Sequence, residues 1–192
     1  MNKISIRDFW LKVEFHIQIH GHAVVMWSGG KSVNSFIYDK STDVIKDWEN
    51  VTFVFSDERL VPNSSDFSNA GNLLRNLKNN GLNANVLSIG DPEKYLNEVL
   101  QVLKRKNNKS ILIALIGMGE DGHTLGMWKT HEDESIVHKR KNEDFYRFSF
   151  TPILLNRLCA NKVMIINSEK KKKIFNDQNS LTKQLNISYY YD

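Results

Sequence analysis

The residues best suited to chemistry lie in a glycine-rich segment, GMGEDGHT at residues 117–124, directly after the apolar run Ile111 to Ile116. A histidine flanked by acids can serve as a general base near neutral pH, and His123 follows Glu120 and Asp121 here. A lone histidine is more often structural than catalytic. Open α/β sheets, however, bind ligands at the carboxyl ends of their strands, where this segment falls. We therefore expect His123 to be functional.

A second segment, Ser28 to Ser32, follows the strand candidate Ala23 to Trp27 and precedes a short helix. Gly29 and Gly30 allow backbone N–H groups to turn toward a ligand, and a helix N-terminus favours a phosphate. An ordinary tight turn fits the same residues equally well. The end of the segment, Gly-Lys-Ser, matches the end of a Walker A loop, but that motif needs glycine where this chain has Val25. A nucleoside triphosphate site is therefore set aside.

Charged residues follow the next strand candidate, Val51 to Phe55. Asp57 and Arg59 come directly after it, and Asn69 opens a helix further on. Acidic and basic groups at a strand end cost solvation unless they pair or bind a ligand, and arginine binds carboxylate or phosphate with a fork of donors. A surface Asp–Arg pair of little energetic consequence is the alternative.

The elements that position these segments form an α/β pattern. Helical patterns lie between most of the apolar runs of strand length, which is typical of a largely parallel sheet with helices on both faces. Runs rich in Val, Ile and Leu on both alternating faces are expected to be inner strands. The strand candidates are Ala23 to Trp27, Val51 to Phe55, Asn85 to Ile89, Ile111 to Ile116, Tyr146 to Phe150 and Lys162 to Ile166.

Two helices have clear boundaries. One begins at the N-cap Asp91 with Pro92 in the first turn. Its apolar stripe is Tyr95, Leu96, Val99, Leu100 and Leu103. The other begins near Asn69 and stops near Gly81, with Leu73, Leu74 and Leu77 inward. The polar stretch 129–144 is aperiodic, so we expect a surface loop or a short irregular helix there.

Length and composition are those of an ordinary globular protein. The 192 residues, 41% of them hydrophobic and 25% charged, fit one domain over residues 1–192. A net charge of +4 favours anionic partners. The single Cys159 permits no internal disulfide. Neither a signal peptide nor an apolar run of about 18 residues is present, so we expect a cytoplasmic protein without a membrane span.

The three polar segments, in this order, resemble the 6-phosphogluconolactonase family, which is related to glucosamine-6-phosphate deaminases and ribose-5-phosphate isomerases. SGGKS is similar to an SGGST-like loop of the family, SDERLVPNSSDFSN to its GDER segment with a downstream SN, and GMGEDGHT to its GMGxDGHT loop. RFSFT at Arg147 to Thr151 resembles its RITLT-like strand, and NSEK at Asn167 to Lys170 its GxxK element. The similarity spans roughly residues 23–173, and the GEDGHT loop is its most specific part.

The resemblance implies a Rossmann-like fold and hydrolysis of 6-phosphogluconolactone, or a related phosphorylated sugar lactone, to 6-phosphogluconate, without a cofactor or metal. His123 would activate water, with Asp57 and Glu120 or Asp121 orienting the water or the substrate. A positioned base and a remote phosphate clamp also suit ester hydrolysis on chemical grounds. The expected substrate and phosphate contacts are Ser28, Gly29, Gly30, Lys31, Ser32, Arg59, Asn69, Gly119, Arg147 and Lys170.

Two other functions stay open at this point. A deaminase or aldose–ketose isomerase would need a group that moves the C2 proton, for which Asp57 is the candidate. That branch typically has DEY where this chain has DER, and an IAFNEP-like stretch after DGH, so Arg59 and Thr124 favour the lactonase branch. The third hypothesis is a sugar-phosphate-binding homologue without turnover.

Several positions depart from the resemblance. Lys31 replaces a small hydroxyl residue, while Ser56 and Asn167 replace glycines. LGMWKTHE, residues 125–132, replaces an ASLFPG-like continuation. The catalytic residue types are retained, and the changes bear on substrate identity.

The remaining charged and aromatic clusters have structural explanations. Lys170 to Lys173 has no interleaved aromatic residues for base stacking, so we expect a solvated helix face and no nucleic acid partner. Contiguous residues cannot all point at one ion, so His131 to Glu134 is read as surface rather than as a metal site. Tyr189 to Tyr191 is expected to be an edge strand or a packed tail. The sequence indicates no particular oligomeric state.

Overall fold

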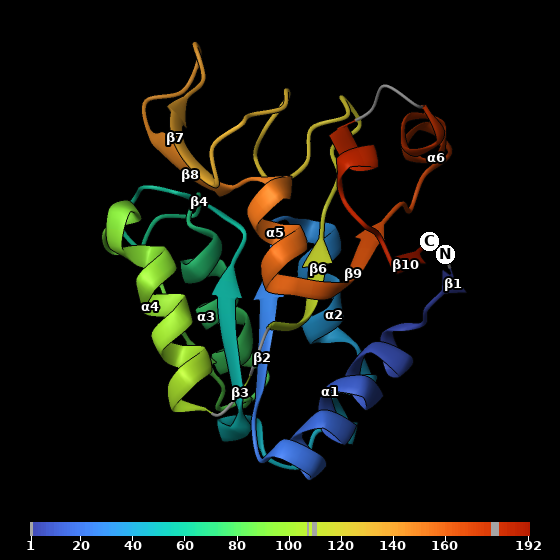
Figure 1. Cartoon of the computed structure of the whole chain (residues 1–192). Coiled ribbons are helices and arrows are strands. Elements are labelled where there is room, and N and C mark those ends of the chain that lie inside the picture. Colours follow the sequence, from blue (N-terminus) through green and yellow to red (C-terminus); the bar gives the residue numbers. More distant parts are fainter. Residues whose placement is uncertain (1, 107, 109–110, 178–180) are drawn as a thin grey trace.

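A parallel sheet forms the centre of the molecule (Figure 1). The computed structural model describes residues 2–106, 108, 111–177 and 181–192. Within these residues the sheet has seven strands in the order β1-β10-β9-β6-β2-β3-β5, and every neighbouring pair is parallel. The strands are β1 (Asn2–Lys3), β2 (Ala23–Trp27), β3 (Val51–Phe55), β5 (Asn85–Val86), β6 (Ile111–Ile116), β9 (Cys159–Ile165) and β10 (Tyr189–Tyr191).

Helices cover both faces of this sheet, which confirms the predicted Rossmann-like α/β class. Alternate residues of each inner strand point to opposite faces. Val25 and Trp27 therefore pack with α1 (Ile6–His20), α2 (Lys31–Tyr38) and α3 (Asn69–Asn79). Val24 and Met26 pack with α4 (Pro92–Arg105), α5 (Pro152–Leu158) and α6 (Glu169–Asn176). Short 3-10 helices occupy Lys40–Val44, Trp48–Asn50 and Leu181–Gln184.

A second, antiparallel sheet lies beyond the carboxyl ends of the parallel strands (Figure 1). It consists of β4 (Asp57–Arg59), β8 (Tyr146–Phe150) and β7 (Ser135–Lys139), in the order β4-β8-β7. The strand expected at Tyr146 to Phe150 is present, but it belongs to this sheet and not to the parallel one. The expectation of a loop or irregular helix over residues 129–144 was wrong for Ser135–Lys139, because pairing with β8 makes this polar stretch extended.

Some expected details differ because tertiary pairing and packing set them. Of the expected strand Asn85 to Ile89, only Asn85–Val86 is a strand, and it pairs with β3. Leu74 and Leu100, expected to face inward, are 39% and 44% exposed. The Tyr189–Tyr191 strand is not at the edge, since it lies between β1 and β9.

The boundary predictions for α3 and α4 hold. The Asp91 carboxylate accepts a hydrogen bond from the backbone N–H of Glu93 at 3.0 Å, which caps α4. Asn69 is the first residue of α3, and Gly81 follows its end with φ of 68°. No helix in the described residues has both the length and the apolar content to cross a membrane.

Candidate active site

The carboxyl ends of β2, β3 and β6 open onto a cavity of about 230 Å³. A parallel sheet brings these ends to one edge, so the three polar segments meet there. Ten of the fourteen expected site residues line the cavity: Ser28, Gly29, Gly30, Lys31, Ser32, Asp57, Arg59, Gly119, His123 and Arg147. Glu120, Asp121, Asn69 and Lys170 do not line it.

The turn between β2 and α2 is fastened to the neighbouring strand end. Ser28 Oγ donates to the carbonyl of Leu115 at 2.8 Å and accepts from the backbone N–H of Gly117 at 3.1 Å. Gly30 has φ of 105°, a backbone conformation that residues other than glycine rarely adopt, and it immediately precedes α2. The turn therefore opens toward the cavity with the N-terminus of α2 behind it.

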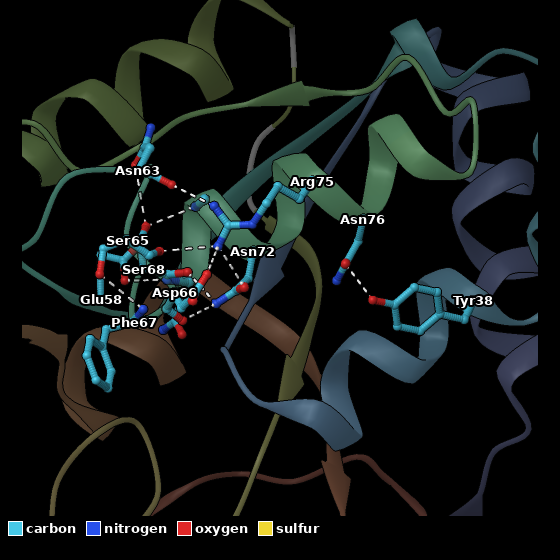
Figure 2. Close-up of polar contacts among 12 residues, drawn as sticks. Tyr38, Glu58, Asn63, Ser65, Asp66, Phe67, Ser68, Asn72, Arg75 and Asn76 are labelled. Atoms are coloured by element: carbon cyan, nitrogen blue, oxygen red, sulfur yellow. Dashed lines mark hydrogen bonds and ion pairs between the residues drawn. The ribbon is translucent and has the colours of Figure 1, made fainter.

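A buried glutamate positions the start of α3. Glu58, 4% exposed, accepts hydrogen bonds from the backbone N–H groups of Arg59, Asn69 and Ala70, each at 2.7 Å. Figure 2 shows it beside Ser68, whose hydroxyl donates to it at 3.2 Å. Burial raises the pKa of Glu58, and the three backbone N–H bonds oppose that rise. Glu58 thereby fixes the position of Asn69 relative to β4.

Arg75 on α3 holds the loop that leads into this helix (Figure 2). Its guanidinium donates to the carbonyls of Asn63 at 3.0 Å and Ser65 at 3.2 Å. It also donates to the side chain of Asn72 at 2.9 Å. The loop is therefore tied to the helix that begins at Asn69.

Asn69 organises two of the cavity residues although it does not line the cavity itself. Its Nδ2 donates to the carbonyl of Asp57 at 2.9 Å, and its Oδ1 accepts from Nη1 of Arg59. Its side chain lies so close to Gly29 that a Cβ at that glycine would overlap it. The buried Nε of Arg59 has no hydrogen-bond partner among the described residues. Arg59 itself lines the cavity.

A second arginine lies across from Arg59 in the antiparallel sheet. Arg147 of β8 is the register partner of Arg59 of β4. Its Nε and Nη2 donate to the two carboxylate oxygens of Glu143 at 2.8 and 2.6 Å. These bonds lower the pKa of Glu143. The pairing holds Arg147, 7% exposed, in place at the cavity wall.

His123, which lines the cavity, forms a close pair with Asp121. Nδ1 of His123 lies 2.5 Å from Oδ1 of Asp121. A Cβ at Gly119 would overlap both side chains, so the pair depends on this glycine. Partial burial opposes ionisation of Asp121, but hydrogen bonds from Trp128 and His123 outweigh it and lower the pKa of Asp121 to about 2. A carboxylate on Nδ1 of a histidine fixes the tautomer and leaves Nε2 as a proton acceptor.

The lysine of α6 that lines the cavity is Lys171, which the sequence reasoning missed. Lys171 is 9% exposed, lines the cavity and donates to Oδ1 of Asn167 at 2.8 Å, and burial lowers its pKa. Lys170 points elsewhere: its ammonium lies 3.8 Å from Glu120, and both side chains are exposed. Helical spacing could have identified Lys171, because it lies one turn before the buried Phe175 and therefore on the same face of the helix.

No group of three or more His, Cys, Asp or Glu side chains arranged to hold a metal occurs among the described residues. The cavity is instead rich in cations, with Lys31, Arg59, Arg147 and Lys171 around it. These cations and the His123–Asp121 pair define an α/β protein with a cation-lined cavity beside a candidate base.

Comparison with known proteins identifies the family of this chain. The sequence model of glucosamine-6-phosphate isomerases/6-phosphogluconolactonase matches residues 6–186. The chain belongs to this family, which confirms the resemblance seen in its motifs.

Named relatives agree with this assignment. The 6-phosphogluconolactonase of Helicobacter pylori strain J99 is 30% identical over 166 residues, covering 81% of this chain and 71% of that protein. The 6-phosphogluconolactonase of Pseudomonas aeruginosa is 31% identical over 112 residues, 56% of this chain, and the match spans only 47% of that relative's length. The crystal structure of a 6-phosphogluconolactonase from Shewanella baltica has a TM-score of 0.74 at 16% identity, covering 97% of this chain and 90% of that one, and it shows the shared fold.

Proposed function

We propose that this protein hydrolyses 6-phosphogluconolactone, or a related phosphorylated sugar lactone, to the corresponding 6-phosphogluconate. The observation that carries the proposal is the His123–Asp121 pair on the same cavity as Arg59, Arg147 and Lys171. Relatives of the chain bear the name 6-phosphogluconolactonase, which supports this substrate. A phosphorylated lactone presents both an ester carbon and a remote dianion, and the cavity offers a group for each.

The chemistry begins with His123. With Nδ1 paired to Asp121, Nε2 accepts a proton from a water molecule as the water oxygen attacks the lactone carbonyl carbon. The resulting tetrahedral intermediate expels the ring oxygen, and the C–O bond of the lactone breaks. The imidazolium returns its proton to that oxygen, which becomes a hydroxyl. The new acid releases its own proton to solvent, so no cofactor is consumed.

The cations would hold the substrate at its other end. Arg59 offers its guanidinium, and Lys171 and Lys31 add positive charge, while the Gly29 to Ser32 turn adds backbone N–H groups. Binding a remote phosphate orients the carbonyl carbon for attack and lowers the entropic part of the barrier. Arg147, already paired with Glu143, would contribute mainly to the positive potential.

The three acidic side chains have different roles in this mechanism. Asp57 lines the cavity, so it would orient the water or a sugar hydroxyl. Asp121 acts through His123. Glu120, which lies near Lys170 and is exposed, is assigned no step.

The isomerase or deaminase alternative must also be tested, because Asp57 places a carboxylate at the cavity wall, and a carboxylate is the kind of group that moves a C2 proton.

The direct experiment tests three compounds as substrates of the purified protein: freshly prepared 6-phosphogluconolactone, glucosamine 6-phosphate and fructose 6-phosphate. Lactone hydrolysis well above the uncatalysed rate is the expected result. Ammonia release from glucosamine 6-phosphate without lactone hydrolysis would assign the chain to the other branch. Binding of all three without turnover would leave a sugar-phosphate-binding protein.

We also expect one domain over residues 1–192, a cytoplasmic location, and a small-molecule ligand rather than nucleic acid. The support for the last point is that Lys31, Arg59, Arg147 and Lys171 come from four different segments and line one cavity of small-molecule size.

A further inference from the structure

A tryptophan in the stretch that departs from the family motif completes the surroundings of the candidate base. The indole Nε1 of Trp128 donates to Oδ2 of Asp121 at 2.8 Å. The other oxygen of the same carboxylate, Oδ1, faces Nδ1 of His123 at 2.5 Å. Asp121 therefore bridges the indole and the imidazole, and each of its oxygens has its own partner.

The two rings also lie against each other. The centroids of His123 and Trp128 are 4.6 Å apart and the ring planes are inclined by 31°. The imidazole is thus held at its Nδ1 edge by Asp121 and on its face by the indole. Trp128 is 38% exposed, so part of the indole remains in contact with solvent.

A cation from the connection between β7 and β8 also contacts the indole. The guanidinium carbon of Arg140, just after β7, lies 4.0 Å from the centroid of the Trp128 ring. A guanidinium over an indole is favourable by cation–π attraction. Arg140 also lies 3.5 Å from Glu143, the carboxylate that holds Arg147 at the cavity wall. The same connection between β7 and β8 therefore supports the base and one of the cavity cations.

We infer that Trp128 is a positioning residue for the reaction: its N–H fixes the Asp121 carboxylate, and its ring fixes the plane of His123. The inference rests on the proposed function, because it assigns Trp128 to the same site. Without the indole N–H, Oδ2 of Asp121 loses the donor that fixes it, and the carboxylate is held through its contacts with His123 alone among the bonds described above. His123 then loses the single orientation that directs Nε2 at water. A purely structural tryptophan would need only its ring.

Trp128→Phe separates these two roles, since it keeps an aromatic ring and removes the donor. The first readout needs no substrate. Nitrogen-15 chemical shifts of His123 at alkaline pH report which ring nitrogen carries the proton. The parent should show the Nδ1–H tautomer, and Trp128→Phe should show a mixture with Nε2–H. The same tautomer in both proteins would overturn the inference.

The second readout is kinetic. Loss of a hydrogen bond to a charged group that orients the base is expected to lower kcat about tenfold in Trp128→Phe, with KM within about twofold of the parent. Arg140→Gln should show a smaller fall in kcat. Its matched control is Lys139→Gln, since the Lys139 ammonium lies over Tyr146 and not over Trp128, and kcat should stay at the parent value.

The tautomer and the kinetic measurements distinguish a failure of the proposed function from a failure of the inference about Trp128. If the parent hydrolyses no lactone, the proposed function fails, and the tautomer comparison still decides whether Trp128 orients His123. If the parent is active and Trp128→Phe retains full kcat, the inference fails and the proposed function stands.

Discussion

The guanidinium of Arg59 offers the most specific test of phosphate binding. One of its nitrogens donates to Asn69, whereas its buried Nε has no hydrogen-bond partner in the described part of the chain. Arg59 lines the cavity, so a phosphate there would accept from its guanidinium. Arg59→Lys keeps the positive charge but removes the planar fork of donors. The substitution therefore isolates the hydrogen bond from the charge.

The expected size of the effect follows from that one bond. A hydrogen bond to a charged group contributes about 1.5–3 kcal/mol. That range corresponds to about a 10- to 150-fold loss in kcat/KM for the phosphorylated lactone. An unphosphorylated sugar lactone has no group to accept the bond, so its kcat/KM should change by less than about threefold.

The assay measures kcat/KM of the parent and of Arg59→Lys with each of the two lactones. Arg157→Lys is the matched control, because this arginine is exposed and pairs with Glu134 away from the cavity. Equal losses for the phosphorylated and unphosphorylated lactones would refute the reasoning, since they would mean that Arg59 supports the site in general and not the phosphate.

Three further predictions concern other parts of the site and fold. Lys171→Met should raise KM for the phosphorylated lactone about tenfold, whereas Lys170→Met should leave it within about twofold, and steady-state kinetics would expose the reverse order. Gly119→Ala should lower kcat by at least about tenfold, because the added methyl group overlaps His123, and an unchanged kcat would contradict that contact. Burial lowers the pKa of His22 from 6.5 to about 4, so the unfolded chain binds the extra proton first as the pH falls. Urea unfolding should therefore show a loss of about 3 kcal/mol between pH 7.5 and pH 4 that is absent in His22→Gln; equal pH dependence would contradict it.

Much of the site could be predicted because it is built from short segments that follow apolar strands. In a parallel sheet, chain position alone brings the ends of β2, β3 and β6 to one edge. The glycines of GMGEDGHT and the acids beside His123 were therefore informative before any coordinates. The motifs also carried the family resemblance, which the match over residues 6–186 confirms.

The elements that escaped prediction depend on pairing between distant residues. β7 has no alternating apolar pattern, and it is extended because β8 supplies its hydrogen-bond partners. Lys171 and not Lys170 lies at the cavity because the rotation of α6 is set by the packing of Phe175. Trp128 could not be assigned from spacing, since its contact with Asp121 depends on how the loop after His123 turns back.

The most direct test of the account is the turnover of freshly generated 6-phosphogluconolactone, followed through 6-phosphogluconate dehydrogenase, by the parent and by His123→Ala. Losing a general base typically lowers the rate by about 10²- to 10⁴-fold. We expect the parent to exceed the uncatalysed hydrolysis clearly and His123→Ala to fall by that factor while remaining folded. An equally active His123→Ala, or a parent no faster than the background, would contradict the central claim that His123 activates water for lactone hydrolysis.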